Sequence, residues 1–182
     1  IGIDYGAKMS GNTVIAHFVT TQIHFLQVDK KKDADTWITK VLETLQADVV
    51  YLDAPLSLPA AYFGTGESYH YREADKITRA MSPMFLGGLT ARAMSLKASL
   101  STLIFHEIYP AFFQSELVQS THYKEDITLF LQDLAKIEAF TLGEQPTNWH
   151  QVDALIALLI GTRHQEQRHQ EIGNPTEGII II

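Results

Sequence analysis

The sequence predicts an α/β protein built on one mixed sheet, and the order of its apolar runs is the main reason. Three short β-prone runs come first, a helical segment follows, and later strands alternate with helices. A helix between two strands normally makes a right-handed parallel connection. We therefore expect five strands, three antiparallel and then parallel ones, flanked by helices. With 182 residues, 46% of them hydrophobic, the chain fits a single domain over residues 1–182.

The first three strands are predicted from short apolar or alternating segments. Ile1–Tyr5 is short, apolar and carries an acid near its end, as a buried central strand would. Asn12–Val19 and Gln22–Val28 alternate partly between apolar and polar residues, and Thr20-Thr21 separates them. This pattern predicts a hairpin, so the first three strands should be antiparallel.

Residues 36–53 predict a helix and the fourth strand. Apolar residues recur at helical spacing from Thr36 to Gln46, and Asp33 or Asp35 is a suitable N-cap. Asp48–Asp53 is an apolar strand that stops before Pro55. The crossover through this helix should place the fourth strand parallel to the first.

The segment Ala54–Ser101 is predicted to be a mostly helical insertion, with breakers at Ser82-Pro83 and Gly87-Gly88. Two interpretations remain open for it, a lid or substrate platform and an ordinary helical insertion with solvated charges. Its basic and aromatic residues that could contact a nucleic acid are Arg72, Arg79, Arg92, Lys97, Tyr62, Phe63, Tyr69 and Tyr71.

The rest of the chain predicts further strands and helices. A strand is expected at Leu103–Tyr109, with Pro110 starting a helical turn after it. Two helices are expected, one at Lys124–Ile137 and one from Thr147 or Asn148 to about Gln165. An edge strand is expected at Gly178–Ile182. The run Arg163–Gln170 contains two His and three Gln residues. We interpret it as the solvated end of a helix rather than a metal-binding tract.

Composition excludes several classes of protein. The chain has no cysteine, so disulfides and thiolate metal sites are impossible. No apolar stretch reaches the roughly 20 residues that span a bilayer, and no signal peptide is evident, so we expect a cytoplasmic protein without membrane contact. The net charge of -7 argues against a generally basic nucleic-acid-binding surface. Two bound divalent ions would offset about four of these charges, so nucleic acid stays a candidate partner.

Asp4 and Asp53 are the strongest candidates for a functional site. Each lies at the carboxyl end of an apolar strand, where an ionised carboxylate is costly unless it is paired or holds a cation. Ligands of open sheets bind beyond these strand ends. Neighbouring strands are about 4.8 Å apart, so the two acids could bridge one ion. The alternative is that Asp4 caps the following turn and Asp53 forms an Asx-type cap before Pro55.

His150 and Asp153 are the next candidates. Their i, i+3 spacing on the last helix places them on one face, and both residue types can ligate a divalent ion. Alternatively, Asp153 only stabilises the helix N-terminus. His150 is either a ligand or proton-transfer group, or a simple surface residue.

Glu107 lies in the predicted fifth strand and has two interpretations. It is either a fourth ligand of the catalytic site or a buried acid paired with an arginine. The candidate partners are Arg72, Arg79 and Arg92.

Several short motifs resemble one known family. The motifs are Gly2-Ile3-Asp4, Asp53-Ala54-Pro55-Leu56-Ser57-Leu58-Pro59, Arg72-x-x-Asp75, Glu107-x-Tyr109-Pro110-Ala111, Asp153-Ala154 before an apolar helix, and Glu177-Gly178-Ile179. With its motifs in this order, the chain resembles the predicted nucleases of ribonuclease H-like fold. This is a domain-of-unknown-function family near the Holliday-junction resolvase branch. The resemblance covers nearly the whole chain.

The resemblance implies a two-metal nuclease. Acids on the first strand, the fourth strand and a late helix hold two Mg²⁺ or Mn²⁺ ions in such enzymes, which implicates Asp4, Asp53 and Asp153. His150 lies where the resolvase branch has a further ligand. The implied reaction is phosphodiester hydrolysis, with one ion activating a water and the other stabilising the leaving 3′ oxygen. Lys8, Arg72 and Arg79 are the expected substrate-binding residues.

Two other classes of function remain open. Asp4-Tyr5-Gly6 followed by Lys8 and a hairpin also looks like the first phosphate loop of actin-like sugar kinases, which would make the protein a phosphotransferase. That class needs two related lobes, and 182 residues supply one. The third class is a binding protein that keeps the ribonuclease H-like fold without catalysis.

Overall fold

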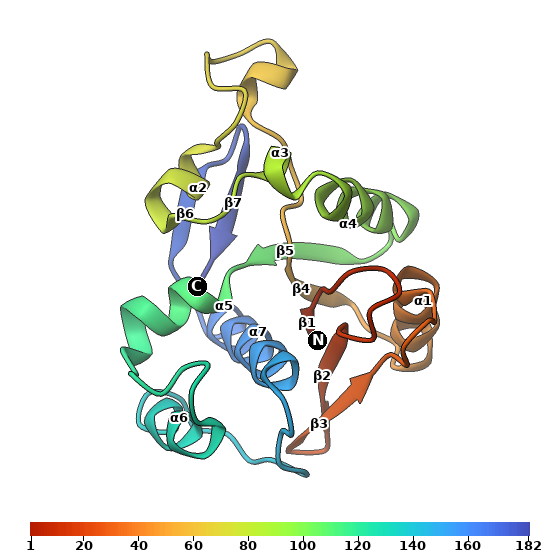
Figure 1. The fold of residues 1–182 in the computed structure, drawn as a ribbon, viewed down its shortest axis with the longest axis vertical. Helices are drawn as coiled ribbons and strands as arrows, with labels where there is room; N and C mark the ends of the chain where they lie inside the picture. Colours follow the sequence, from red (N-terminus) through yellow and green to blue (C-terminus); the bar gives the residue numbers. More distant parts are fainter.

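The computed structural model describes residues 1–182 and contains a seven-stranded mixed sheet in the order β3-β2-β1-β4-β5-β7-β6 (Figure 1). The strands are β1 (Gly2–Asp4), β2 (Val14–Val19), β3 (Gln22–Gln27), β4 (Val49–Asp53), β5 (Ile104–Ile108), β6 (Glu171–Asn174) and β7 (Gly178–Ile181). The helices are α1 (Ala34–Thr44), α2 (Glu73–Thr78), α3 (Pro83–Leu86), α4 (Gly88–Ser99), α5 (Pro110–Phe113), α6 (Ile127–Leu134) and α7 (Trp149–Gln165), with a 3₁₀ turn η1 (Ala60–Phe63) and a π turn η2 (Gln114–Val118).

The predicted α/β class and the mixed sheet are confirmed. β1, β2 and β3 are antiparallel, and β4 and β5 follow in parallel. The predicted number of five strands is wrong, because a hairpin of β6 and β7 extends the sheet beyond β5. Gly178–Ile182 was expected at the edge, but β7 pairs with both β5 and β6. The edge strand is β6, whose short sequence Glu-Ile-Gly-Asn carries little apolar signal.

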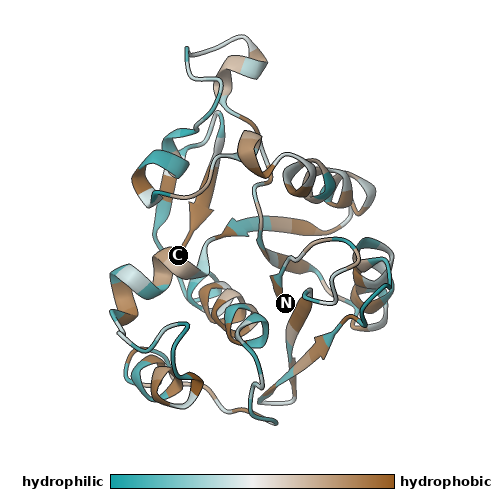
Figure 2. Ribbon diagram, viewed as in Figure 1, coloured by the Kyte–Doolittle hydropathy of each residue, from teal (hydrophilic) through white to brown (hydrophobic).

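Helices cover both faces of the sheet. α7 crosses one face with α5 and α6 beside it, and the core there includes side chains from β2, β4, β5 and β7. On the other face, α1 and α4 pack against the opposite side chains of β1, β2, β4 and β5. Figure 2 shows mostly hydrophobic residues in the middle of the sheet and on β7. No helix of the structure has the length and apolar character needed to cross a membrane.

The segment 54–101 contains less helix than predicted. Only α4 is long, while η1, α2 and α3 are single short turns. α4 buries Ala93 and Leu96 against the sheet, so this part belongs to the core rather than to a lid. The loop around η1 projects from the body of the protein (Figure 1). The glycine predicted to break the helix does so, because Gly87 has a positive φ of 44° and separates α3 from α4.

Two glycines let α7 approach the sheet closely. A Cβ at Gly2 would lie 2.2 Å from the backbone nitrogen of Leu158, and a Cβ at Gly161 would lie 2.4 Å from the ring of Tyr51. Both contacts are closer than any side-chain carbon tolerates, so the helix rests on the main chain of β1 and on a ring from β4. This contact positions the N-terminal part of α7 above the end of β1.

Glu138 forms ion pairs with Arg163 at the end of α7 and with Arg168 in the loop before β6. Its carboxylate is 5% exposed, forms an ion pair with Arg163, and accepts hydrogen bonds from Arg168 at 2.9 and 3.2 Å. Burial raises the pKa of Glu138, but the hydrogen bonds from Arg168 and Arg163 outweigh burial, and the pKa is lowered.

We expect Glu138→Gln to destabilise the protein by about 2 kcal/mol at pH 7, since two arginines lose their charged partner. Because the folded pKa lies below the unfolded value of about 4.3, the stabilisation is present above that pH and is lost as pH falls through the folded pKa. Urea unfolding from pH 3 to 7 should therefore show a shallower pH dependence in the variant.

Glu166→Gln is the matched control. Glu166 also pairs with Arg168, at 2.6 Å, but its side chain is 53% exposed. An exposed pair contributes little, so this variant should stay within about 0.5 kcal/mol of wild type. Equal losses in the two variants would refute the role given to Glu138.

Candidate metal centre

Asp4 and Asp53 lie side by side at the carboxyl ends of β1 and β4. The two strands are parallel, and Asp4 is the register partner of Asp53. Their neighbours Ile3 and Leu52 pack in the core beneath α1 and α4. Because side chains alternate along a strand, both carboxylates face the side covered by α7. Neither side chain caps a turn, so the capping alternative does not apply to either acid.

α7 brings His150 and Asp153 to the same place. Asn148 caps the helix by accepting a hydrogen bond from the Gln151 backbone nitrogen at 3.1 Å. His150 Nδ1 lies 2.8 Å from Asp4 Oδ2. Asp153 is 6% exposed and therefore points into the protein from the first turns of the helix.

Asp153 has two partners that the sequence did not suggest. The Tyr123 hydroxyl donates a hydrogen bond of 2.7 Å to its Oδ1, and the Lys124 ammonium forms an ion pair with its Oδ2. The helix predicted over Lys124–Ile137 is present but shorter, because α6 spans Ile127–Leu134 with Asp126 as its N-cap. Lys124 lies in the preceding loop with a positive φ of 66°. No local pattern marks this residue, since only the tertiary fold brings it to Asp153.

Asp53 is the acid without a partner. No hydrogen bond or ion pair to its carboxylate is present, although the residue is partly buried. Burial raises the pKa of Asp53 well above its usual range, and the nearby carboxylates of Asp4 and Asp153 raise it further. Lys124 acts in the opposite direction but does not compensate. The ionised form of Asp53 is therefore disfavoured in the metal-free protein, and a bound cation would stabilise it.

Asp4 and His150 influence each other's pKa through their hydrogen bond. Burial raises the pKa of Asp4, the hydrogen bond from His150 lowers it, and Asp153 raises it, with a net upward shift. The same hydrogen bond raises the pKa of His150. The hydrogen bond to Asp4 therefore favours the protonated form of His150, and the Lys124 ammonium lies beside Asp153.

Glu107 belongs to the opposite face of the sheet from Asp4 and Asp53, although it lines the same cavity as they do. Phe105, two residues earlier on β5, packs in the core beneath α4, whereas Ile108 packs on the α7 side. Arg72, which is completely buried, donates two hydrogen bonds to Glu107 at 2.5 and 2.7 Å. Of the two interpretations of Glu107, the structure thus favours the buried acid paired with an arginine over the metal ligand.

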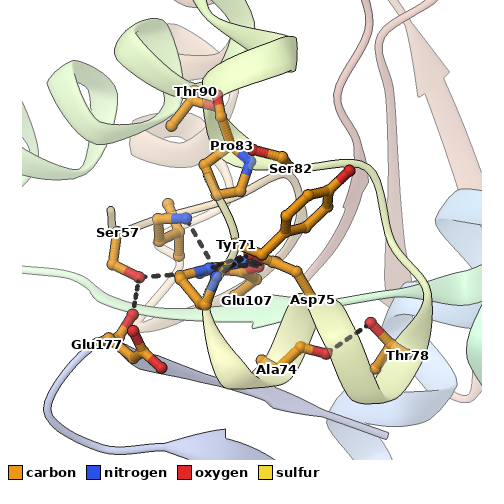
Figure 3. A network of polar contacts seen from close by, with 12 residues as sticks. Ser57, Tyr71, Ala74, Asp75, Thr78, Ser82, Pro83, Thr90, Glu107 and Glu177 are labelled. Atoms are coloured by element: carbon orange, nitrogen blue, oxygen red, sulfur yellow. Dashed lines mark hydrogen bonds and ion pairs between the residues drawn. The ribbon is translucent and has the colours of Figure 1, made fainter. Parts of the chain in front are cut away.

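Arg72 is the centre of a buried network, and Figure 3 labels three of its partners, Ser57, Asp75 and Glu107. Besides Glu107, it contacts Asp75 at 2.6 Å and donates to the Ser57 hydroxyl at 2.8 Å. Glu107 also accepts a hydrogen bond of 2.8 Å from the Leu56 backbone nitrogen. Arg72 therefore connects α2, β5 and the loop that follows Asp53. Arg72 is completely buried in this network and also lines the cavity that Asp4 and Asp53 line, so its substrate contact stays a prediction.

The other two expected substrate-binding residues lie on the surface. Lys8 is half exposed and pairs with Asp33 at 3.0 Å. Arg79 ends α2 in a left-handed conformation, is exposed, and forms no ion pair. Both remain predictions for substrate contact.

A cavity of about 240 Å³ opens beside the acids. Asp4 and Asp53 line its floor, and Met81, Leu86 and Leu89 contribute apolar walls from α3, α4 and the preceding loop. Tyr109, from the end of β5, also lines it, and burial followed by the charge of Asp53 raises the pKa of its hydroxyl. The cavity gives a small ligand access to Asp53.

As they stand, no three His, Asp or Glu side chains form a complete set of metal ligands, and Asp4 and Asp153 bond to His150 and Lys124 instead. No family model matches the chain, and neither a curated protein nor a solved structure shows significant similarity to it. The site must therefore be interpreted from its own chemistry.

Proposed function

We propose that the protein is a metal-dependent nuclease that hydrolyses phosphodiester bonds at the centre formed by Asp4, Asp53 and Asp153. One observation carries the proposal: Asp53 is an unpartnered carboxylate beside Asp4, with two further groups, Asp153 and His150, brought in by α7. Carboxylates in this density are typical ligands of Mg²⁺ and Mn²⁺. The ribonuclease H-like resemblance of the sequence motifs supports the same three acids.

Each residue has a defined part in this proposal. Asp4, Asp53 and Asp153 would be the carboxylates that hold the ions, with Asp4 next to both Asp53 and His150. Bound ions supply an activated water and stabilise the leaving oxygen. Lys124 and His150 balance the acids in the metal-free protein and must release them when ions bind. His150 then holds a proton close to the reacting groups.

Metal titration of wild type and Asp4→Asn tests the proposal. We expect Mn²⁺ or Mg²⁺ to raise the melting temperature of wild type, because a ligand that binds only the folded state stabilises it. At a metal concentration of about 100 times Kd, the gain is roughly 2.7 kcal/mol. Asp4→Asn should lose this response, together with cleavage of labelled single-stranded and duplex DNA and RNA.

Chelation with EDTA should abolish cleavage in wild type and leave its metal-free melting temperature unchanged. Cleavage that persists in EDTA, or in Asp4→Asn at the wild-type rate, would remove the support for a metal-dependent nuclease. A melting temperature that changes neither with added metal nor with Asp4→Asn would also remove the support for a metal site.

One observation favours the second candidate, a binding protein without catalysis. Both oxygens of Asp153 already have partners, Tyr123 and Lys124, so this acid is satisfied without an ion. In that case Lys124→Met should bring no metal response and no cleavage. Under the nuclease proposal, the same variant should bind Mn²⁺ more tightly than wild type, because the competing ammonium is gone.

A further inference from the structure

A cluster of three histidines lies at the end of α7 that is remote from Asp153. His164 is eleven residues further along the helix, which corresponds to roughly 16 Å. Its ring centroid lies 4.4 Å from that of His106 on β5 and 4.4 Å from that of His169, just before β6. The sequence predicts a solvated helix end here, but the structure packs these rings together between three elements, and the His169 side chain is only 20% exposed.

Two outer contacts orient the rings. The Tyr51 hydroxyl lies 2.9 Å from His164 Nδ1, which leaves His164 Nε2 without a partner. Glu171 Oε1 lies 3.8 Å from His169 Nε2. His169 Nδ1 is buried and has no hydrogen-bond partner. A polar atom that is buried and unpaired is costly, and a bound ion is one group that would satisfy it.

Two of the rings have one nitrogen near an oxygen atom and one nitrogen without a partner, a combination that is also typical of histidines in metal sites. A ligating imidazole usually has its other nitrogen bonded to a carboxylate, a carbonyl or another oxygen. Tyr51 and Glu171 have this relation to His164 and His169. The ring nitrogens of His106 make no hydrogen bond and are available as the third donor. Three imidazoles with a fourth position open to water form a common zinc ligand set.

The charge state of the rings is also suitable. Burial lowers the pKa of His106 and His164, and the neighbouring histidines lower each further, so both rings are neutral at pH 7. Lys97 and Glu171 are the charged side chains acting on the cluster, and they act in opposite directions on His106. Metal ions bind the neutral form of imidazole.

We propose that His106, His164 and His169 form a second metal site, selective for a borderline divalent ion such as Zn²⁺ and separate from the acidic centre. Nitrogen ligands prefer Zn²⁺, whereas carboxylates prefer Mg²⁺ and Mn²⁺. In the present arrangement the three rings do not form a complete ligand set, so His106 and His169 turn on binding. Bound metal would tie α7, β5 and the segment before β6 together.

Zinc titration of the full chain, freed of any histidine tag and treated with a chelator, tests this site. We expect one Zn²⁺ per chain by calorimetry, and a melting temperature higher by about 5–10 °C when free Zn²⁺ is near 100 times Kd. His106→Gln and His169→Gln should each bind far more weakly. Tyr51→Phe, which removes only the outer contact, should weaken binding by roughly 10–100-fold.

Three controls distinguish zinc binding at this cluster from binding at a surface histidine, binding at the acidic centre and unfolding of a variant. His70→Gln changes an exposed histidine on another segment and should leave zinc binding unchanged. Asp53→Asn should also keep it, because the acidic centre is not involved. Metal-free melting of His106→Gln checks that the variant folds. The absence of zinc binding in wild type would overturn the proposal, as would wild-type affinity in both histidine variants or loss of binding in Asp53→Asn.

Discussion

Asp53→Asn should reduce phosphodiester cleavage by at least about 1000-fold, which corresponds to about 4 kcal/mol of transition-state stabilisation. The amide keeps the shape of the side chain but removes the charge that would hold an ion. Asp53 is the acid with no protein partner, so nothing else in the structure competes for its carboxylate. The measurement is the rate of cleavage at saturating Mn²⁺.

The same substitution should stabilise the metal-free protein. The carboxylate of Asp53 is disfavoured by burial and by the charges of Asp4 and Asp153. Replacing it with a neutral amide removes this repulsion, with an expected gain on the order of 1 kcal/mol at pH 8. Gain of stability with loss of activity is the signature of a functional acid rather than a structural one.

Asp48→Asn is the control, at the residue just before the same strand. Asp48 is exposed at the opposite end of β4, and its substitution should change neither cleavage nor unfolding. Two results would contradict the prediction for Asp53. One is undiminished cleavage by Asp53→Asn. The other is a metal-free Asp53→Asn protein that unfolds more easily than metal-free wild type.

Arg72→Met should cause the largest loss of stability, about 3–5 kcal/mol. It leaves the buried carboxylates of Glu107 and Asp75 without their shared cation. For a chain of this size the loss corresponds to a fall in melting temperature of roughly 6–20 °C. Thermal and urea unfolding of the metal-free protein measure it directly.

Arg79→Met provides the matched control, since Arg79 is exposed and forms no ion pair. Its unfolding free energy should stay within about 0.5 kcal/mol of wild type. Replacing Arg72, Asp75 and Glu107 together by apolar residues should restore part of the lost stability, because no unpaired charge remains. If Arg72→Met proves as stable as wild type, the buried network does not have the role given to it.

The sequence predicted the fold best where local patterns are strong. The hairpin around Thr20 and the strand ending at Asp53 follow from alternation and from Pro55, and α7 begins at the Asn148 cap. The neighbouring positions of Asp4 and Asp53 could be predicted because both acids end strands that a helical crossover makes parallel. Local chemistry therefore predicted the two acids of the sheet.

What depends on long-range packing could not be predicted. Glu107 lies on the opposite face of the sheet from Asp4 because of the register of β5, and one residue of register decides the face. Lys124 reaches Asp153 from a loop with a left-handed backbone that no periodic pattern marks. The histidine cluster combines residues from β5, α7 and the segment before β6. Only the completed tertiary structure brings these groups into contact.

The close contact of α7 with Gly2 and Gly161 has a consequence for ion size. Main-chain atoms and an aromatic ring, rather than flexible side chains, set the height of the helix above β1. The separation of Asp153 from Asp4 is therefore nearly fixed. Mg²⁺ requires oxygen ligands at about 2.0–2.1 Å and Ca²⁺ at about 2.3–2.6 Å. Because a rigid frame adapts poorly to the larger radius, the proposed metal centre would favour the smaller ion.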